Sequence, residues 1–125
     1  MSNTFSQPAY PGASTLRAAI ADDDVNQLPV LIIAAALNED DRSSLENACI
    51  ALSSHPNETI RGNAILGFGH IARRFQAIGD SVHEIVRRGT KDESEYVRGQ
   101  AYAAADDLEC FLGLTLANEA SPNSK

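Results

Sequence analysis

One segment of this sequence occurs twice, with a shift of 37 residues between equivalent positions. The tripeptide Ile-Arg-Gly at 60–62 recurs as Val-Arg-Gly at 97–99. The upstream apolar positions align at the same shift, so that Leu45, Ala48 and Cys49 fall on Val82, Ile85 and Val86. An approximate earlier copy spans residues 16–37. Repeats of this length are single supersecondary units that bury their apolar faces by stacking, so the sequence predicts about three stacked units.

Each unit has the pattern of two amphipathic helices. Between residues 41 and 52, apolar side chains recur at the i, i+3, i+4 and i+7 spacing of one helix face. The predicted inward residues of the last four helices are Leu45, Ala48, Cys49, Leu52, Ile60, Ala64, Phe68, Ile71, Phe75, Val82, Ile85, Val86, Val97, Ala101, Leu108 and Leu112. The residues suited to helix starts are Ser14 or Thr15, Pro29 in a first turn, Asp41, Asn57, Asp80 or Ser81, and Ser94. The sequence therefore predicts six helices.

Length and composition agree with one helical domain. A chain of 125 residues is long enough for one domain with its own core. Aromatic residues make up only 6% and Trp is absent, which favours helices over a β-sandwich. Proline, glycine and polar residues interrupt the pattern at both ends. We expect a loose N-terminal segment at 1–13, a helical domain at 14–113 and a C-terminal tail at 114–125.

The repeated segments resemble HEAT-type repeats. Residues 56–61 and 92–98 each combine a turn containing Pro or Asp with an apolar–Arg pair, followed by Ala64 and Ala101. The resemblance covers residues 40–112 well and 14–39 loosely. It implies an all-α fold, namely a short right-handed α-solenoid of about three HEAT-like helix pairs. It also implies that Arg61 and Arg98 are structural and bond to acidic groups or carbonyls in the adjoining turns.

The net charge of −7, with an isoelectric point near 4.8, limits the partners that this chain can attract. Binding to phosphate backbones depends on Lys and Arg, so nucleic acid and anionic membranes are disfavoured and a basic protein is favoured. The basic residues Arg73, Arg74, Arg87, Arg88 and Lys91 fall in the last turns of the fourth and fifth helices. Helix C-termini favour cations, and a nucleic-acid patch is the less favoured alternative.

The start of the chain lacks the basic and apolar regions of a signal peptide. The longest apolar run, residues 29–37, is too short to span a bilayer. We therefore expect a cytoplasmic protein. The two cysteines, Cys49 and Cys110, are expected to be buried free thiols in such a reducing compartment.

No arrangement of residues points to catalysis. His83-Glu84 resembles one of the His-Glu pairs that bind iron in HEAT-repeat hydroxylases, which use several such pairs, whereas this chain has one. We expect no metal, no cofactor and no enzymatic activity. The sequence Gly67-Phe68-Gly69 lies within a predicted helix and lacks the pattern of a phosphate-binding loop. Because glycine weakens a helix, it indicates either close packing of the fifth helix or close approach of a partner.

The candidate binding residues come from the second helices of the last two pairs, which line one side of a stack of pairs. Outside the core face, His70 of the fourth helix is equivalent to Asp107 of the sixth. Aspartate is unfavourable within a helix, so the acidic residues at 106–109 indicate either a His70–Asp107 pair or a carboxylate patch for a basic ligand. An aromatic ring beside carboxylates suits a cationic partner. The predicted binding residues are Leu66, His70, Tyr102, Asp106, Asp107 and Glu109.

Over residues 54–70 and 92–101 the chain resembles small bacterial HEAT-like immunity proteins of contact-dependent growth inhibition. This resemblance implies a cytoplasmic inhibitor that binds a basic nuclease toxin, with EndoU-type RNases as the candidate class. We expect the protein to be a monomer on its own. A general HEAT-repeat scaffold or adaptor is the alternative function. A HEAT-type lyase of bilin pigments or a DNA glycosylase is less favoured.

Overall fold

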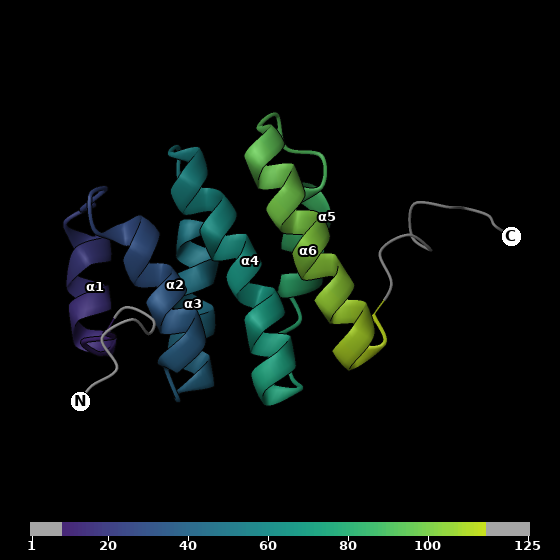
Figure 1. The fold of residues 1–125 in the computed structure, drawn as a ribbon, viewed down its shortest axis with the longest axis horizontal. Helices are drawn as coiled ribbons and strands as arrows, with labels where there is room; N and C mark the ends of the chain where they lie inside the picture. The colour runs from purple at the N-terminus through teal and green to yellow at the C-terminus, as the bar shows by residue number, and fades with distance from the viewer. Residues whose placement is uncertain (1–8, 115–125) are drawn as a thin grey trace, which may run out of the picture.

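The computed structural model describes residues 9–114, which form six α-helices and no strand. The helices are α1 (Ala13–Ala21), α2 (Leu28–Asn38), α3 (Arg42–Leu52), α4 (Glu58–Phe75), α5 (Val82–Gly89) and α6 (Glu95–Leu112). Helices α2, α4 and α6 lie side by side, and α3 and α5 lie behind them (Figure 1). The prediction of an all-α fold is confirmed. The predicted end segments fall partly outside the described residues, namely at 1–8 and 115–125.

Helix starts follow the predicted residues in five of the six helices: Pro29 lies in the first turn of α2, Ser81 precedes α5, and α3, α4 and α6 begin after capping side chains. The side chain of Asp41 accepts a hydrogen bond from the Ser44 amide, and that of Asn57 accepts bonds from the next helical amides. Ser94 does the same for the Val97 amide at 3.2 Å. The prediction for α1 is wrong, because this helix begins at Ala13 after Gly12, so Ser14 and Thr15 lie inside it. Gly12 has a φ of 115°, a conformation that glycine adopts without strain.

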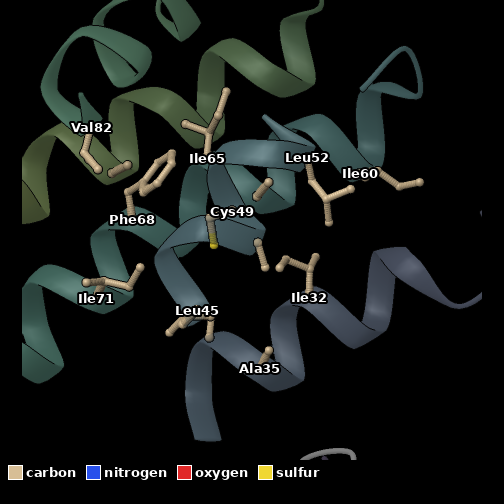
Figure 2. Close-up of a cluster of buried hydrophobic side chains, with 14 of the residues drawn as sticks. Ile32, Ala35, Leu45, Cys49, Leu52, Ile60, Ile65, Phe68, Ile71 and Val82 are labelled. Carbon is tan, nitrogen blue, oxygen red and sulfur yellow. The ribbon is translucent and has the colours of Figure 1, made fainter. Parts of the chain in front are cut away.

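The core lies between the two rows of helices (Figure 2). Phe68 of α4 is fully buried among apolar side chains from α3 and α5, including Leu45 and Val82. Complete burial of such a side chain stabilises the fold by about 1.5–3 kcal/mol. Most predicted inward residues are buried, whereas Phe75, Ile85 and Leu112 are only partly buried. The predicted period therefore identifies the core faces of α3, α4, α5 and α6.

The cysteines differ from each other. Cys49 is a fully buried free thiol, as predicted, and burial raises its pKa to about 12. Cys110 is an exposed free thiol, which contradicts the prediction. It lies two residues after Leu108, a core residue of α6, and therefore on the opposite side of that helix.

The glycines of α4 allow close helix packing, but not against the predicted neighbour. A Cβ at Gly67 would lie 2.7 Å from the sulfur of Cys49 in α3. A Cβ at Gly69 would lie 2.6 Å from Oδ2 of Asp107 and 3.2 Å from the Cα of Ala104, both in α6. The prediction that these glycines pack against α5 is therefore wrong. The helix period shows which side of α4 carries small residues, but it does not show which helix packs on that side.

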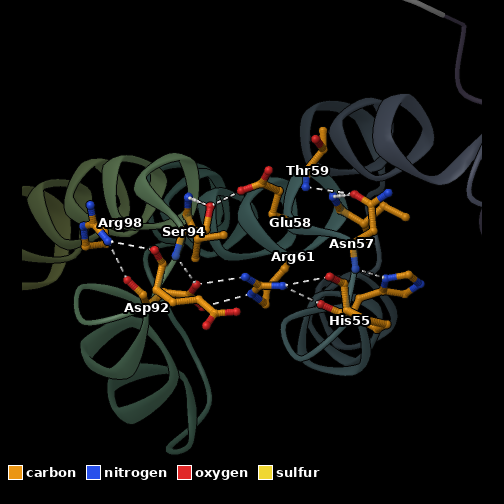
Figure 3. A network of polar contacts seen from close by, with 12 residues as sticks. His55, Asn57, Glu58, Thr59, Arg61, Asp92, Ser94 and Arg98 are labelled. Atoms are coloured by element: carbon orange, nitrogen blue, oxygen red, sulfur yellow. Dashed lines mark hydrogen bonds and ion pairs between the residues drawn. The ribbon is translucent and has the colours of Figure 1, made fainter.

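The turns α1–α2, α3–α4 and α5–α6 lie at one edge of the molecule (Figure 1). The last two of these turns are joined by a turn network, defined here as His55, Glu58, Arg61, Asp92, Ser94 and Arg98 (Figure 3). Arg61 donates two hydrogen bonds to the carboxylate of Asp92, at 2.9 and 2.8 Å, and a third to the carbonyl of His55 at 2.9 Å. These bonds to Arg61 lower the pKa of Asp92. The Ser94 hydroxyl donates to the carboxylate of Glu58. Arg98 donates to the carbonyls of Asp92 and Glu93.

A histidine connects this network to the first pair. Nδ1 of His55 accepts a hydrogen bond from the Asn57 amide at 2.9 Å, so Nε2 holds the ring hydrogen. Nε2 lies 2.6 Å from Oδ1 of Asp23 in the turn between α1 and α2. The three turns are thus linked in chain order.

The five cations expected at the ends of α4 and α5 do not form one patch. Helices α4 and α5 run in opposite directions, so their C-terminal ends lie at opposite ends of the molecule (Figure 1). Arg74 bonds to the carbonyl of Ala36 at 2.9 Å, and Arg87 forms a two-point ion pair with Glu84. This separation leaves the nucleic-acid alternative without a continuous basic surface in the described part of the chain.

Candidate protein-binding face

The candidate site is built on the close contact between α4 and α6. At one end of this contact, a Cβ at Gly62 would lie 2.8 Å from the ring of Tyr96. Two turns further along α4, Gly69 leaves room for Asp107. The seven-residue spacing puts both glycines on the same side of α4. The sequence therefore brings α6 against the backbone of α4 along two turns.

A polar cluster joins α2, α4 and α6 at the Gly62 end. Asn63 is buried, and its amide nitrogen donates to the carbonyl of Pro29 at 3.0 Å. Its amide oxygen accepts from the Tyr96 hydroxyl and, at 3.4 Å, from Gln100. Sequence reasoning missed this cluster, although Asn63 aligns with Gln100 in the repeat and both positions are polar. A polar side chain on a mostly apolar helix side was the available signal.

His70 and Asp107 are neighbours, but Arg73 is the residue in contact with both. An Arg73 nitrogen donates to Nδ1 of His70 at 2.6 Å, and another lies 3.9 Å from Oδ2 of Asp107. Burial, followed by the charge of Arg73, lowers the pKa of His70, while the carboxylate of Asp107 acts in the opposite direction. The predicted direct His70–Asp107 pair is therefore replaced by a His70–Arg73–Asp107 group in which the imidazole is neutral.

The six predicted binding residues fall into two groups. Leu66, His70 and Asp107 are partly buried where α4 meets α6. Tyr102 is 59% exposed, and Asp106 and Glu109 are also exposed. The repeat aligns Tyr102 with Ile65 and Asp106 with Gly69, two residues of α4 that contact the following pair. The second group therefore lies on the side of α6 that faces away from α4.

Charge compensation also separates the two groups. Asp107 has Arg73 as a partner, whereas Asp106 and Glu109 form no ion pair within residues 9–114. The exposed ring of Tyr102 lies within one or two helical turns of both Asp106 and Glu109. This arrangement can bind a cationic surface, because the carboxylates supply charge and the ring supplies apolar area.

An apolar groove of about 370 Å³ lies at the other end of the molecule, between α1 and α3. Leu16, Ile20 and Ala48 are among its lining residues. The hydroxyl of Tyr10 donates to Glu39 at 2.6 Å beside it, and burial and this carboxylate raise the pKa of Tyr10. Sequence reasoning did not identify this groove, since its walls come from two helices of different pairs.

Within residues 9–114, no three His, Cys, Asp or Glu side chains are grouped as metal ligands. None of the helices described combines the length and the apolar character needed to cross a bilayer. Comparisons with protein-family models, with curated proteins and with solved structures find no match.

Proposed function

We propose that this protein is an immunity protein that binds a basic nuclease toxin in the cytoplasm and neutralises it without catalysing a reaction. Its fold, on this proposal, is a short right-handed α-solenoid of three HEAT-like helix pairs. The equivalent bonds of Arg61 and Arg98 to the carbonyls of residues 55–56 and 92–93 support the repeat. The order of the linked turns supports stacking of the pairs.

The observation on which the binding role rests is a pair of carboxylates on α6, Asp106 and Glu109, which lie beside an exposed tyrosine and have no ion pair within residues 9–114. A helix position gives aspartate no conformational advantage, so Asp106 weakens α6 and gains no ion pair from residues 9–114 in return. A nuclease presents cations to its substrate, and an acidic protein with a net charge of −7 is attracted to that surface. Substrate mimicry by charge is the mechanism that this arrangement supports best.

The test combines identification of the partner with a charge-matched pair of variants. The partner is captured from the native cell and identified by mass spectrometry, and a large toxin gene is expected next to the gene for this protein. Asp106→Lys with Glu109→Lys should weaken binding to the captured toxin by more than about 2 kcal/mol, roughly thirty-fold. Helicity should stay unchanged.

The control changes the net charge equally at exposed carboxylates elsewhere, through Asp22→Lys with Asp80→Lys. This control should retain nearly full inhibition of the toxin. If the α6 variant still inhibits at a near-stoichiometric ratio, the binding site lies outside α6. The acidic turns at 22–24 and 92–95 would then be the next candidates.

A general scaffold or adaptor is the second candidate, and the groove between α1 and α3 favours it. This groove is apolar and lies at the opposite end of the molecule from α6. Two separate surfaces allow two partners to be held at once. Capture of a stable complex with two different proteins, neither of them a toxin, would support this role instead.

A further inference from the structure

The outer side of α6 repeats the features by which α4 receives the next helix pair. On α4, the space beside Gly62 holds the ring of Tyr96, and the paired nitrogens of Arg61 hold the carboxylate of Asp92. Glu58 accepts the Ser94 hydroxyl at the same end of the helix. Each of these receiving residues has its equivalent 37 positions later, on α6. We call Glu95, Arg98, Gly99, Tyr102, Asp106 and Glu109 the terminal edge.

The receiving positions of the terminal edge are open. No described atom lies within 4 Å of a Cβ built at Gly99. Arg98 uses one nitrogen for the carbonyls of Asp92 and Glu93, as Arg61 does for its own turn, but the described chain offers no carboxylate to its other nitrogens. Glu95 is exposed and forms no hydrogen bond through its side chain within residues 9–114. The edge therefore has unused sites for a carboxylate, a ring and a hydroxyl.

The second half of the terminal edge differs from α4 in charge. Asp106 takes the place of Gly69, and Glu109 takes the place of Ala72. Gly69 lets the next helix approach to backbone contact, whereas a carboxylate at the same place requires a basic group opposite. A helix that fits this edge is therefore acidic in the turn before its start, aromatic in its first turn and basic about three turns later.

We propose that the terminal edge docks one helix of a partner protein, with the partner helix parallel to α6 and in the place that α6 takes beside α4. The carboxylate before the partner helix binds Arg98, its aromatic ring covers Gly99, and its Lys or Arg binds Asp106 and Glu109. This inference rests on the proposed protein-binding role and specifies which element of the partner is bound. It does not depend on the partner being a toxin.

Charge and composition favour a different protein over a second copy or the end of this chain. In a row of copies, α2 of the next molecule would lie against the terminal edge, but α2 has no Lys or Arg for its carboxylates. Two copies with a net charge of −7 each also repel one another. Residues 115–125 contain no aromatic residue. The features of the edge are thus met by a partner with mixed charge.

A segment of this chain can serve as a probe for the proposed docking mode. A synthetic peptide of residues 80–112 contains the helix pair that covers the equivalent side of α4. In the intact chain, Asp107 of this segment meets Gly69 and Arg73, whose equivalents on the terminal edge are Asp106 and Cys110. The probe is therefore made with Asp107→Lys, which supplies the basic group that the edge requires.

Binding of the labelled probe to the full chain is measured by fluorescence anisotropy. The wild-type chain should bind it, and Gly99→Leu should weaken binding about ten-fold or more, because the new side chain fills the space meant for the ring. Ala18→Leu introduces the same side chain at an exposed position of α1 and should leave binding unchanged. A probe with Tyr96→Ala, or one that retains Asp107, should bind about ten-fold more weakly to the wild-type chain.

Three results would overturn the docking proposal. These are equal binding by the wild-type chain and Gly99→Leu, absence of binding by the wild-type chain at about millimolar probe, and a wild-type dimer in sedimentation that Gly99→Leu abolishes. The last result would assign the edge to a second copy. If the probe fails but Asp106→Lys with Glu109→Lys still prevents toxin binding, the proposed function stands and only this docking mode is wrong.

Discussion

At the scale of single residues, Arg61 and Arg98 show how one repeated position serves two environments. Both bond to two carbonyls of the preceding turn, but within residues 9–114 only Arg61 also holds a carboxylate from the next turn. The Arg61 and Asp92 side chains are only 14% and 18% exposed. Removal of either side chain would therefore leave the charge of the other without a partner in poorly hydrated surroundings. Arg61 therefore joins the turns of two helix pairs, whereas Arg98 bonds only within its own turn in the described chain.

Substitution of the two arginines should separate these roles. Arg61→Met should lower the free energy of unfolding by about 2–3 kcal/mol, because Asp92 is left half-buried without its partner. Arg98→Met should lower the free energy of unfolding by only about 1 kcal/mol, because it removes hydrogen bonds to carbonyls at an exposed turn. Urea unfolding followed by circular dichroism measures both values. Equal losses would show that the Arg61–Asp92 bond adds nothing to the link between pairs.

The His70 group predicts how stability responds to pH. Burial and Arg73 lower the pKa of His70 in the folded chain below the ordinary value of 6.5. The unfolded chain then binds a proton first as the pH falls, so His70 should reduce the free energy of unfolding between pH 6.5 and the lower folded-state pKa. In the His70→Gln variant, the free energy of unfolding should fall less over this pH range. Titration of His70 by NMR above 6.5 would contradict the assignment.

At the scale of elements, glycine has opposite consequences in α4 and in α6. Gly62 and Gly69 of α4 are covered by α6, while Gly99 of α6 has open space around it. A helix with such a glycine gives up intrinsic stability in order to receive a neighbour closely. Internally α6 is that neighbour, and at the terminal edge the described chain has none.

Three alanine substitutions test this contrast. Gly99→Ala should raise the free energy of unfolding by about 1 kcal/mol, the ordinary helix preference of alanine over glycine. Gly69→Ala should instead lower it by about 1–2 kcal/mol, because the new methyl group meets Asp107 and the backbone at Ala104. Gly62→Ala should also lower it, through the ring of Tyr96. Thermal unfolding ranks the three, and stabilisation by Gly69→Ala would show that the contact is loose.

The repeat and the apolar period predict six helices, the core faces of the last four and most of the helix starts. They did not predict which helix packs on the glycines of α4, because a period identifies a side of one helix and not its neighbour. The sequence predicts one binding patch on α6, although Asp107 contacts α4 and Asp106 does not. Adjacent residues in a helix point about 100° apart, so this division became visible only once the position of α4 was known.

At the scale of the whole molecule, the distribution of charge should control the rate of association more than the lifetime of a complex. A net charge of −7 attracts a basic partner over a distance that salt shortens. Association with the captured toxin should slow as ionic strength rises from about 0.01 M to 0.15 M, while dissociation changes little. Surface plasmon resonance at several salt concentrations measures both rates. A salt-dependent dissociation rate with constant association would contradict electrostatic steering.

The unequal burial of the two cysteines gives the molecule a natural site for a spectroscopic label. Cys49 is enclosed beside Gly67 with a pKa near 12, so a maleimide dye at neutral pH should modify only the exposed Cys110. Intact-mass spectrometry should show one adduct on the folded chain and two after denaturation. Cys110 is one residue from Glu109, so the dye would report on the terminal edge with no engineered cysteine. Quenching or a change in anisotropy would then give a direct optical signal of partner arrival.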